Sequence, residues 1–125
     1  MRRSSPSLNL SNTMEYTIDA KNKTLGRLAS EIAGILQGKK SAYYNPRLAG
    51  ADSVVVTNVK DMTVTGNKAT QKRYYRHTGY MGHLHSKTYE QLMAEDPKKV
   101  LRHAVERMLP KNTLRKKRML RLTIQ

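Results

Sequence analysis

The sequence predicts an α/β domain built around a parallel sheet. A helix-type segment lies between two strand-type segments within residues 16–56, and this order is a βαβ unit. Such units join parallel strands, with a right-handed crossover in nearly all cases. The chain of 125 residues fits one domain, because roughly 100–150 residues is the commonest domain size. We place the domain at residues 15–125, with a basic C-terminal extension from about residue 110, and expect residues 1–14 to form a flexible, basic and Ser-rich tail.

The first strand and the helix follow from the spacing of apolar residues. Tyr16 and Ile18 alternate with polar neighbours over residues 16–20, as in a strand with one buried face. Apolar residues then recur at spacings of three and four over residues 25–37, the pattern of an amphipathic helix. Thr24 suits the N-cap of this helix, and Gly38 suits its end.

The second strand is predicted by the β-branched run at residues 54–56. An unbroken run of this kind is typical of a strand covered on both faces. We expect a further short strand at residues 62–65, then a tight turn at residues 66–68, because Gly and Asn tolerate positive φ.

The second half of the chain has weaker signals. Residues 69–87 lack a period, so we predict a long basic loop with one strand at about residues 73–76. A short helix is expected over residues 88–95, and a longer one begins with Asp96 as its cap and Pro97 in its first position. Pro110 ends that helix, and the tail beyond it offers apolar residues, Leu120 and Leu122 among them, to dock on the core.

The charge indicates a polyanionic partner. Lys and Arg number 24 against 9 Asp and Glu, a net charge of +15, which attracts nucleic acid. A plain solvated surface is the alternative, but it normally mixes both signs. Residues 62–89 contain no acid, and none follows Glu106. These two basic zones predict two contact surfaces.

Several classes of function lack support. The chain has no Cys, which excludes disulfides and thiol chemistry, and no apolar run approaches the roughly 20 residues of a membrane span. His77, His83 and His85 have no nearby acid and match no zinc spacing. Residues 79–82 lack the Lys-Ser or Lys-Thr ending of a nucleotide-binding loop. We therefore expect no enzyme, metal, cofactor, membrane partner or small-molecule substrate.

The segment around residues 73–82 suits an RNA clamp. Gly79 and Gly82 allow close approach of another backbone, tyrosines such as Tyr80 offer stacking faces, and arginines bind phosphate. We expect cations to contact RNA at the end of the first helix and in both basic zones. They are Lys39, Lys40, Lys72, Arg73, Arg76, Arg115, Lys116, Lys117 and Arg118.

The chain resembles the bacterial-type large-subunit ribosomal protein L-thirteen (L13) family over about residues 16–122. The blocks that carry the resemblance are Ile18-Asp19-Ala20 with Lys23-Thr24-Leu25-Gly26-Arg27-Leu28-Ala29, then Val64-Thr65-Gly66-Asn67-Lys68, Tyr75-Arg76-His77-Thr78-Gly79-Tyr80 and Met108-Leu109-Pro110-Lys111-Asn112. The resemblance implies a three-layer α/β/α fold with a four-stranded, mainly parallel sheet. Where the family usually has Gly-Arg after Leu114, this chain has Arg115-Lys116.

The resemblance also implies a function. It is that of a structural constituent of the large ribosomal subunit, which binds ribosomal RNA beside neighbouring ribosomal proteins, supports early assembly and translation, and resides on cytoplasmic ribosomes. The RNA-facing residues that it implies are Lys23, Arg27, Lys68, His77, Thr78, Gly79, Tyr80 and Lys111. A free-standing RNA-binding regulator, a nuclease using the histidines and an organellar ribosome remain as alternatives.

Overall fold

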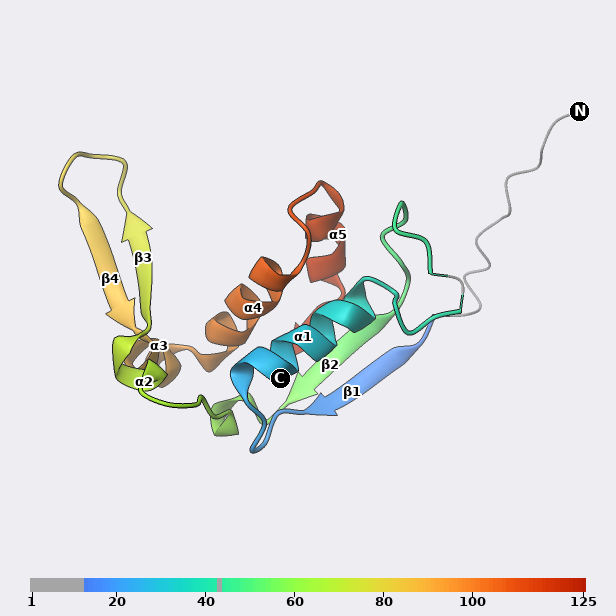
Figure 1. The fold of residues 1–125 in the computed structure, drawn as a ribbon, viewed down its shortest axis with the longest axis horizontal. Coiled ribbons are helices and arrows are strands. Elements are labelled where there is room, and N and C mark those ends of the chain that lie inside the picture. The colour runs from blue at the N-terminus through green and yellow to red at the C-terminus, as the bar shows by residue number, and fades with distance from the viewer. Residues whose placement is uncertain (1–12, 43) are drawn as a thin grey trace, which may run out of the picture.

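The computed structural model describes residues 13–42 and 44–125, which form a mixed α/β structure (Figure 1). The elements are β1 (Glu15–Asp19), α1 (Leu25–Leu36), β2 (Ser53–Thr57), a 3-10 helix (Val59–Asp61), α2 (Lys68–Gln71), β3 (Arg73–His77), β4 (Leu84–Thr88), α3 (Tyr89–Glu95), α4 (Pro97–Met108), α5 (Leu114–Leu120) and β5 (Leu122–Ile124). The α/β class, the βαβ unit and the three predicted helices are confirmed. The predicted tail lies, up to residue 12, outside the described residues.

The main sheet has the strand order β1-β2-β5, and both pairs are parallel. The four-stranded sheet is therefore wrong for the described residues, because residues 62–65 form only one bridge, from Thr63 to Thr24. Thr63 donates its N–H to Lys23 O, and its own oxygen accepts from the N–H of Leu25. Leu25 is already the first residue of α1. The segment that pairs with Thr63 therefore leaves the extended conformation before a second pair of strand residues can form.

One face of the main sheet is covered and the other is largely open. Ile18, Val54 and Val56 are buried, while Thr17 is exposed and Val55 is only half-buried. In this sheet each later strand is added on the same side of the one before it. Right-handed crossovers between strands added in this way place their helices on the same face of the sheet. The expected third layer and the burial of β2 on both faces are thus wrong within the described chain.

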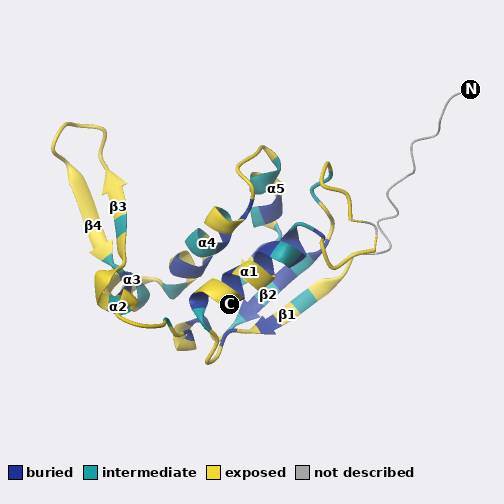
Figure 2. Ribbon diagram, in the orientation of Figure 1, coloured by how far each residue is buried: buried dark blue, intermediate teal, exposed yellow. Residues whose placement is uncertain are grey.

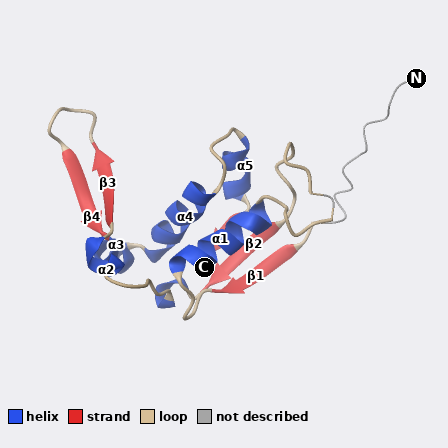
Figure 3. Ribbon diagram, in the orientation of Figure 1, coloured by secondary structure: helices blue, strands red, loops and turns tan. Residues whose placement is uncertain are grey.

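Residues 73–88 form an antiparallel β-hairpin rather than a loop with one strand (Figure 3). Its pairs run from Arg73↔Thr88 to His77↔Leu84. The hairpin projects from the body, and the α2 and α3 helices lie at its base (Figure 1). Its residues are exposed almost throughout (Figure 2), so neither strand has the alternation of apolar and polar residues that reveals a half-buried strand.

The C-terminal segment is also more ordered than a docking tail. It forms α5 and then β5, which supplies the third strand of the main sheet. Leu122 is buried as expected, but Leu120 is 84% exposed. The prediction that Leu120 docks on the core is therefore wrong, because β5 takes over the apolar contact that the tail makes with the sheet.

The helix ends lie where their sequence signals predict, although the Thr24 side chain makes no cap hydrogen bond at the start of α1. Gly38 has a φ of +85°, and the N–H groups of Gly38 and Lys39 donate to Ile35 O and Gly34 O, which is a Schellman ending. The Asp96 carboxylate accepts from Lys99 N at the start of α4. The buried core is aliphatic apart from Tyr89, in a chain that has no Phe and no Trp.

Candidate nucleic-acid interface

The tip of the β3–β4 hairpin is a shaped turn that presents aromatic and apolar side chains to solvent. The Gly79 N–H donates to Nδ1 of His77 at 2.9 Å, and Gly79 and Gly82 have φ values of +92° and +76°. The Tyr80 side chain is 75% exposed and meets the His83 ring edge-on, with 6.4 Å between the ring centroids. The turn thus fixes the loop backbone while it leaves Tyr80 free to stack on a base.

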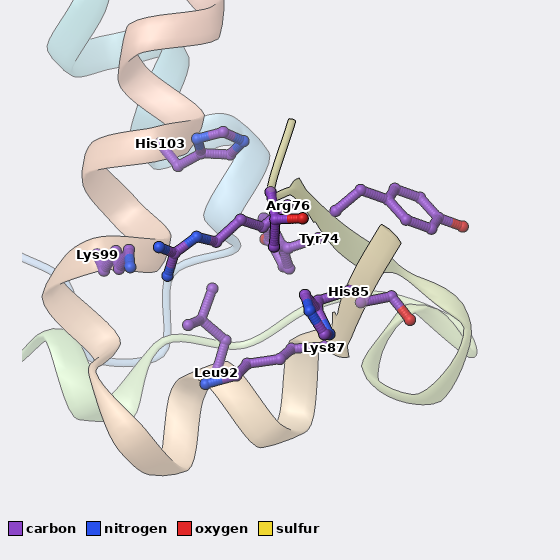
Figure 4. Close-up of a pocket in the computed structure, with 10 residues that line it drawn as sticks. Tyr74, Arg76, His85, Lys87, Leu92, Lys99 and His103 are labelled. Carbon is purple, nitrogen blue, oxygen red and sulfur yellow. The ribbon is translucent and has the colours of Figure 1, made fainter. Parts of the chain in front are cut away.

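The two faces of the hairpin differ in what they meet. Residues paired directly across an antiparallel ladder share a face, so Arg76 and His85 lie on one face, and His77 and Leu84 lie on the other. The face of Arg76 and His85 looks across a cleft toward α4 (Figure 4). The opposite face carries Tyr75, which is 66% exposed and also borders the cleft. An RNA strand can therefore reach the hairpin from both sides.

The cleft is cationic and has a volume of about 720 Å³. Its lining residues are Tyr74, Tyr75, Arg76, Thr78, His85, Ser86, Lys87, Leu92, Lys99 and His103. In Figure 4 the Arg76 side chain extends from β3 toward α4, near Lys99 and His103. Lys87 is paired with Glu95, at 2.6 Å between Nζ and Oε2.

The hairpin is held at its base by Tyr74. The Tyr74 ring meets the ring of His103 edge-on, with 5.5 Å between centroids, and the ammonium of Lys72 lies 5.5 Å from its centroid. Burial lowers the pKa of Lys72, and the charges of Lys68 and Arg107 lower it further. Burial also raises the pKa of Tyr74. Lys72 thus stabilises the base of the hairpin as well as adding charge.

Predicted cations of the second basic zone lie around α5. Lys111, Lys116 and Lys117 are exposed, and Arg115 approaches Glu106 at 4.0 Å. Arg118 is different, because its side chain is only 2% exposed and its guanidinium donates to Leu48 O at 3.1 Å and to Ala49 O at 3.5 Å. The expectation that Arg118 contacts RNA is corrected, since it binds backbone carbonyls of its own chain.

The remaining predicted cations flank the two ends of α1 and the start of the hairpin. Lys23 and Arg27 lie at the first end, where Lys23 approaches Glu31 at 3.7 Å. Lys39 and Lys40 follow the other end, and the ammonium of Lys40 lies 5.3 Å from the Tyr16 ring centroid. Lys68 begins α2, on the hairpin side of the molecule (Figure 1). The predicted residues therefore belong to several surfaces, and the hairpin and the α5 region hold most of them.

Sequence reasoning gave no role to Lys99 and His103 of the cleft, which lie outside both predicted basic zones. Lys99 and His103 are four residues apart on α4, so they share one side of a helix. This four-residue spacing can be recognised in the sequence. The sequence does not indicate which element this side of α4 faces, and the position of the hairpin decides it.

The family model described as Ribosomal protein L13 matches residues 13–124, which is nearly the whole chain. The chain belongs to the ribosomal protein L13 family. It is similar to the large ribosomal subunit protein uL13 of Nostoc sp., with 48% identity over 109 residues that cover 87% of this chain and 72% of the relative. Similarity to the uL13 protein of Clostridioides difficile is comparable, with 47% identity over 109 residues covering 87% of this chain and 76% of that one. The uL13 protein of Alkalilimnicola ehrlichii is 48% identical over 99 residues, which cover 79% and 70% of the two chains.

Membership in the L13 family confirms the resemblance read from the sequence blocks. It also confirms that the chain is a structural ribosomal protein rather than an enzyme, so the nuclease alternative falls. No helix within residues 13–42 and 44–125 has the length and apolar character needed to cross a membrane.

Proposed function

We propose that this L13-family chain is a structural component of the large ribosomal subunit, holds folded ribosomal RNA through its two basic zones, and supports early subunit assembly. The observation that carries the proposal is the β3–β4 hairpin. It projects from the body with Tyr80 exposed at its tip. Its Lys87 is paired with Glu95, whereas Arg73 and Arg76 have no ion-pair partner within the described chain and can meet phosphate. Tyrosines that stack on bases beside arginines that bind phosphate are typical of RNA recognition.

The RNA-binding set proposed for this function follows the sequence prediction without Arg118. Its members are Lys23, Arg27, Lys39, Lys40, Lys68, Lys72, Arg73, Arg76, His77, Thr78, Gly79, Tyr80, Lys111, Arg115, Lys116 and Lys117. The protein's partners would be large-subunit ribosomal RNA and neighbouring ribosomal proteins. The relatives are bacterial, which favours the cytoplasmic ribosome over an organellar one.

The salt dependence of RNA binding tests this proposal. If the chain contacts six to ten phosphates, its affinity for large-subunit ribosomal RNA should fall by roughly 10³ to 10⁵ between 50 and 200 mM salt. Replacing both Arg73 and Arg76 by Gln should reduce the slope of log affinity against log salt by about two, whereas Lys60→Gln, in the exposed 3-10 helix, should leave it unchanged. Affinity that hardly varies with salt would contradict the proposal.

Sedimentation separates a ribosomal component from a free-standing RNA-binding regulator. An integral component stays with large subunits after a high-salt wash, because its contacts are buried among RNA and other proteins. Complete release by that wash, with tight binding to a messenger RNA instead, would favour the regulator.

A further inference from the structure

The cleft between the β3–β4 hairpin and α4 has the lining of a nucleotide site. We propose that it holds one unstacked nucleotide of the bound RNA, with the phosphate between Arg76 and Lys99 and the base against Tyr74 and His103. This inference rests on the proposed function and adds to it a defined binding site for one nucleotide. Part of that site is formed by residues of α4, outside the hairpin.

The first argument is the charge across the cleft. Arg76 comes from β3 and Lys99 from α4, and both line the cleft (Figure 4). Within the described chain neither side chain has a hydrogen-bond or ion-pair partner. Of the acids around the cleft, Glu95 is already paired with Lys87, and Glu106, whose charge acts on His103, approaches Arg115 at 4.0 Å. Two unpaired cations on facing walls favour an anion between them, since charge-assisted hydrogen bonds to phosphate are short and strong.

The second argument is the apolar and aromatic part of the lining. Leu92 and the Tyr74 ring supply apolar surface, and the rings of His85 and His103 add flat faces. A bare phosphate needs only the cations, whereas a base needs stacking surfaces of this kind. The volume of about 720 Å³ is within the 300–1,000 Å³ typical of small-ligand sites. The lining therefore fits a phosphate with a base attached.

The third argument is the state of His103. Its ring packs against Tyr74 at the base of the cleft, and burial lowers its pKa, with the charge of Arg107 as the next cause. The phosphate between Arg76 and Lys99 would lie one helical turn from His103, and its negative charge would act to raise that pKa. His103 is thus a built-in reporter of an anion in the cleft.

Lys99 and Lys98 offer a matched pair for the test. Both are exposed lysines at the start of α4, but only Lys99 lines the cleft. The probe is a single-stranded hexaribonucleotide, titrated into the full chain while the ring signals of His103 are followed by NMR. We expect Lys99→Gln to weaken binding about tenfold, as the loss of one charged hydrogen bond does, and to raise the hexamer concentration needed for the His103 shift by the same factor. Lys98→Gln should leave both unchanged.

Further probes distinguish the sources of the phosphate and of the negative charge. Adenosine monophosphate should shift His103 weakly, and inorganic phosphate more weakly still. A monophosphate that binds as tightly as the hexamer would overturn the assignment to RNA in favour of a free nucleotide. A peptide of glutamates that gives the same His103 shift and displaces the hexamer would overturn it in favour of an acidic protein segment.

The proposed function and the cleft fail in different ways. If Lys99→Gln and Lys98→Gln bind the hexamer equally and His103 does not respond, the cleft proposal is wrong even though ribosomal RNA still binds the hairpin. If the unmodified chain shows no affinity for large-subunit ribosomal RNA, the proposed function itself is wrong. A thermal melt of each variant shows whether the substitution has damaged the fold.

Discussion

Arg121, directly after α5, donates a hydrogen bond from Nη2 to the backbone oxygen of Leu36 at 2.7 Å, across 85 residues of sequence. Leu36 is the last residue of α1, where helix carbonyls lack partners within the helix. The same guanidinium donates to the carbonyl oxygens of Ala49 and Asp52. One side chain therefore joins the end of α1, the connection to β2 and the start of β5.

Replacing Arg121 by Met should lower the free energy of unfolding by at least about 2 kcal/mol. Each hydrogen bond to a charged group contributes about 1.5–3 kcal/mol, and the carbonyls left behind would lose their partner. Urea unfolding followed by circular dichroism measures the difference. Lys117→Met, on the exposed side of α5, is the matched control and should change stability by less than about 0.5 kcal/mol. Equal loss in both variants would show that Arg121 acts only through its charge.

Two glycines near the end of α1 should respond to alanine in opposite directions. Gly38 has a φ of +85°, and an added Cβ would meet only Gly50 Cα at 3.9 Å. The cost of Gly38→Ala is thus conformational, about 1–2 kcal/mol. Gly34 lies inside α1 with nothing within 4 Å of an added Cβ, so Gly34→Ala should stabilise by up to about 1 kcal/mol. The melting temperature of Gly38→Ala should be lower than that of the unmodified chain, and the melting temperature of Gly34→Ala should be higher. A shift of both in the same direction would contradict these assignments.

Removing the Tyr80 ring should weaken RNA binding without harming the fold. The ring is 75% exposed and touches only His83 among the ring contacts of the described chain, whereas stacking on a base is worth about 1–3 kcal/mol. Tyr80→Ala should therefore lower affinity for large-subunit ribosomal RNA by roughly 5- to 150-fold and leave the melting temperature within about 1 °C. Tyr44→Ala, an exposed tyrosine far from the hairpin in sequence, serves as the control. If Tyr80→Ala lowered the melting temperature markedly along with the affinity, Tyr80 would be a residue that stabilises the fold.

The stability of the free protein should fall as the pH drops below neutrality, partly through His103. Burial and the charges of Arg107, Lys72 and Lys99 hold its pKa below the ordinary value of 6.5, against the opposing effect of Glu106. The unfolded chain then binds this proton at higher pH than the folded chain, so the free energy of unfolding decreases from above pH 6.5 down to the folded pKa. Urea unfolding between about pH 7.5 and 5.5 measures the slope. His103→Gln should flatten it, and an unchanged slope would exclude His103 as its source.

The local signals in the sequence predicted the parts of the fold that depend on neighbouring residues. The spacing from Leu25 to Leu36, the cap at Asp96 and the ending at Gly38 are all confirmed, because each is a matter of helix geometry within a few residues. The hairpin was missed because its strands are exposed on both faces. Its pairing depends on two segments meeting, which no period within either segment records.

For the candidate site too, local features of the sequence were predicted and long-range contacts were not. The acid-free stretch around Arg76 and Tyr80 predicted a basic surface, since charge is a property of composition. The sequence could not show that Arg118 is buried, because its burial depends on hydrogen bonds to the carbonyls of Leu48 and Ala49, about 70 residues away in the chain. Lys99 entered the site only when the hairpin was placed across from α4.

By itself, the sequence determined the family, the α/β class, the limits of α1, α3 and α4 and the excess of positive charge. These properties arise from residue types, from short-range spacing and from ordered blocks of similarity. Only the tertiary structure decided that β5 completes the sheet, that Arg121 ties it to α1 and that Arg76 and Lys99 share a cleft. Such contacts join residues far apart in the chain, so the packing of the whole fold selects them and no local pattern encodes them.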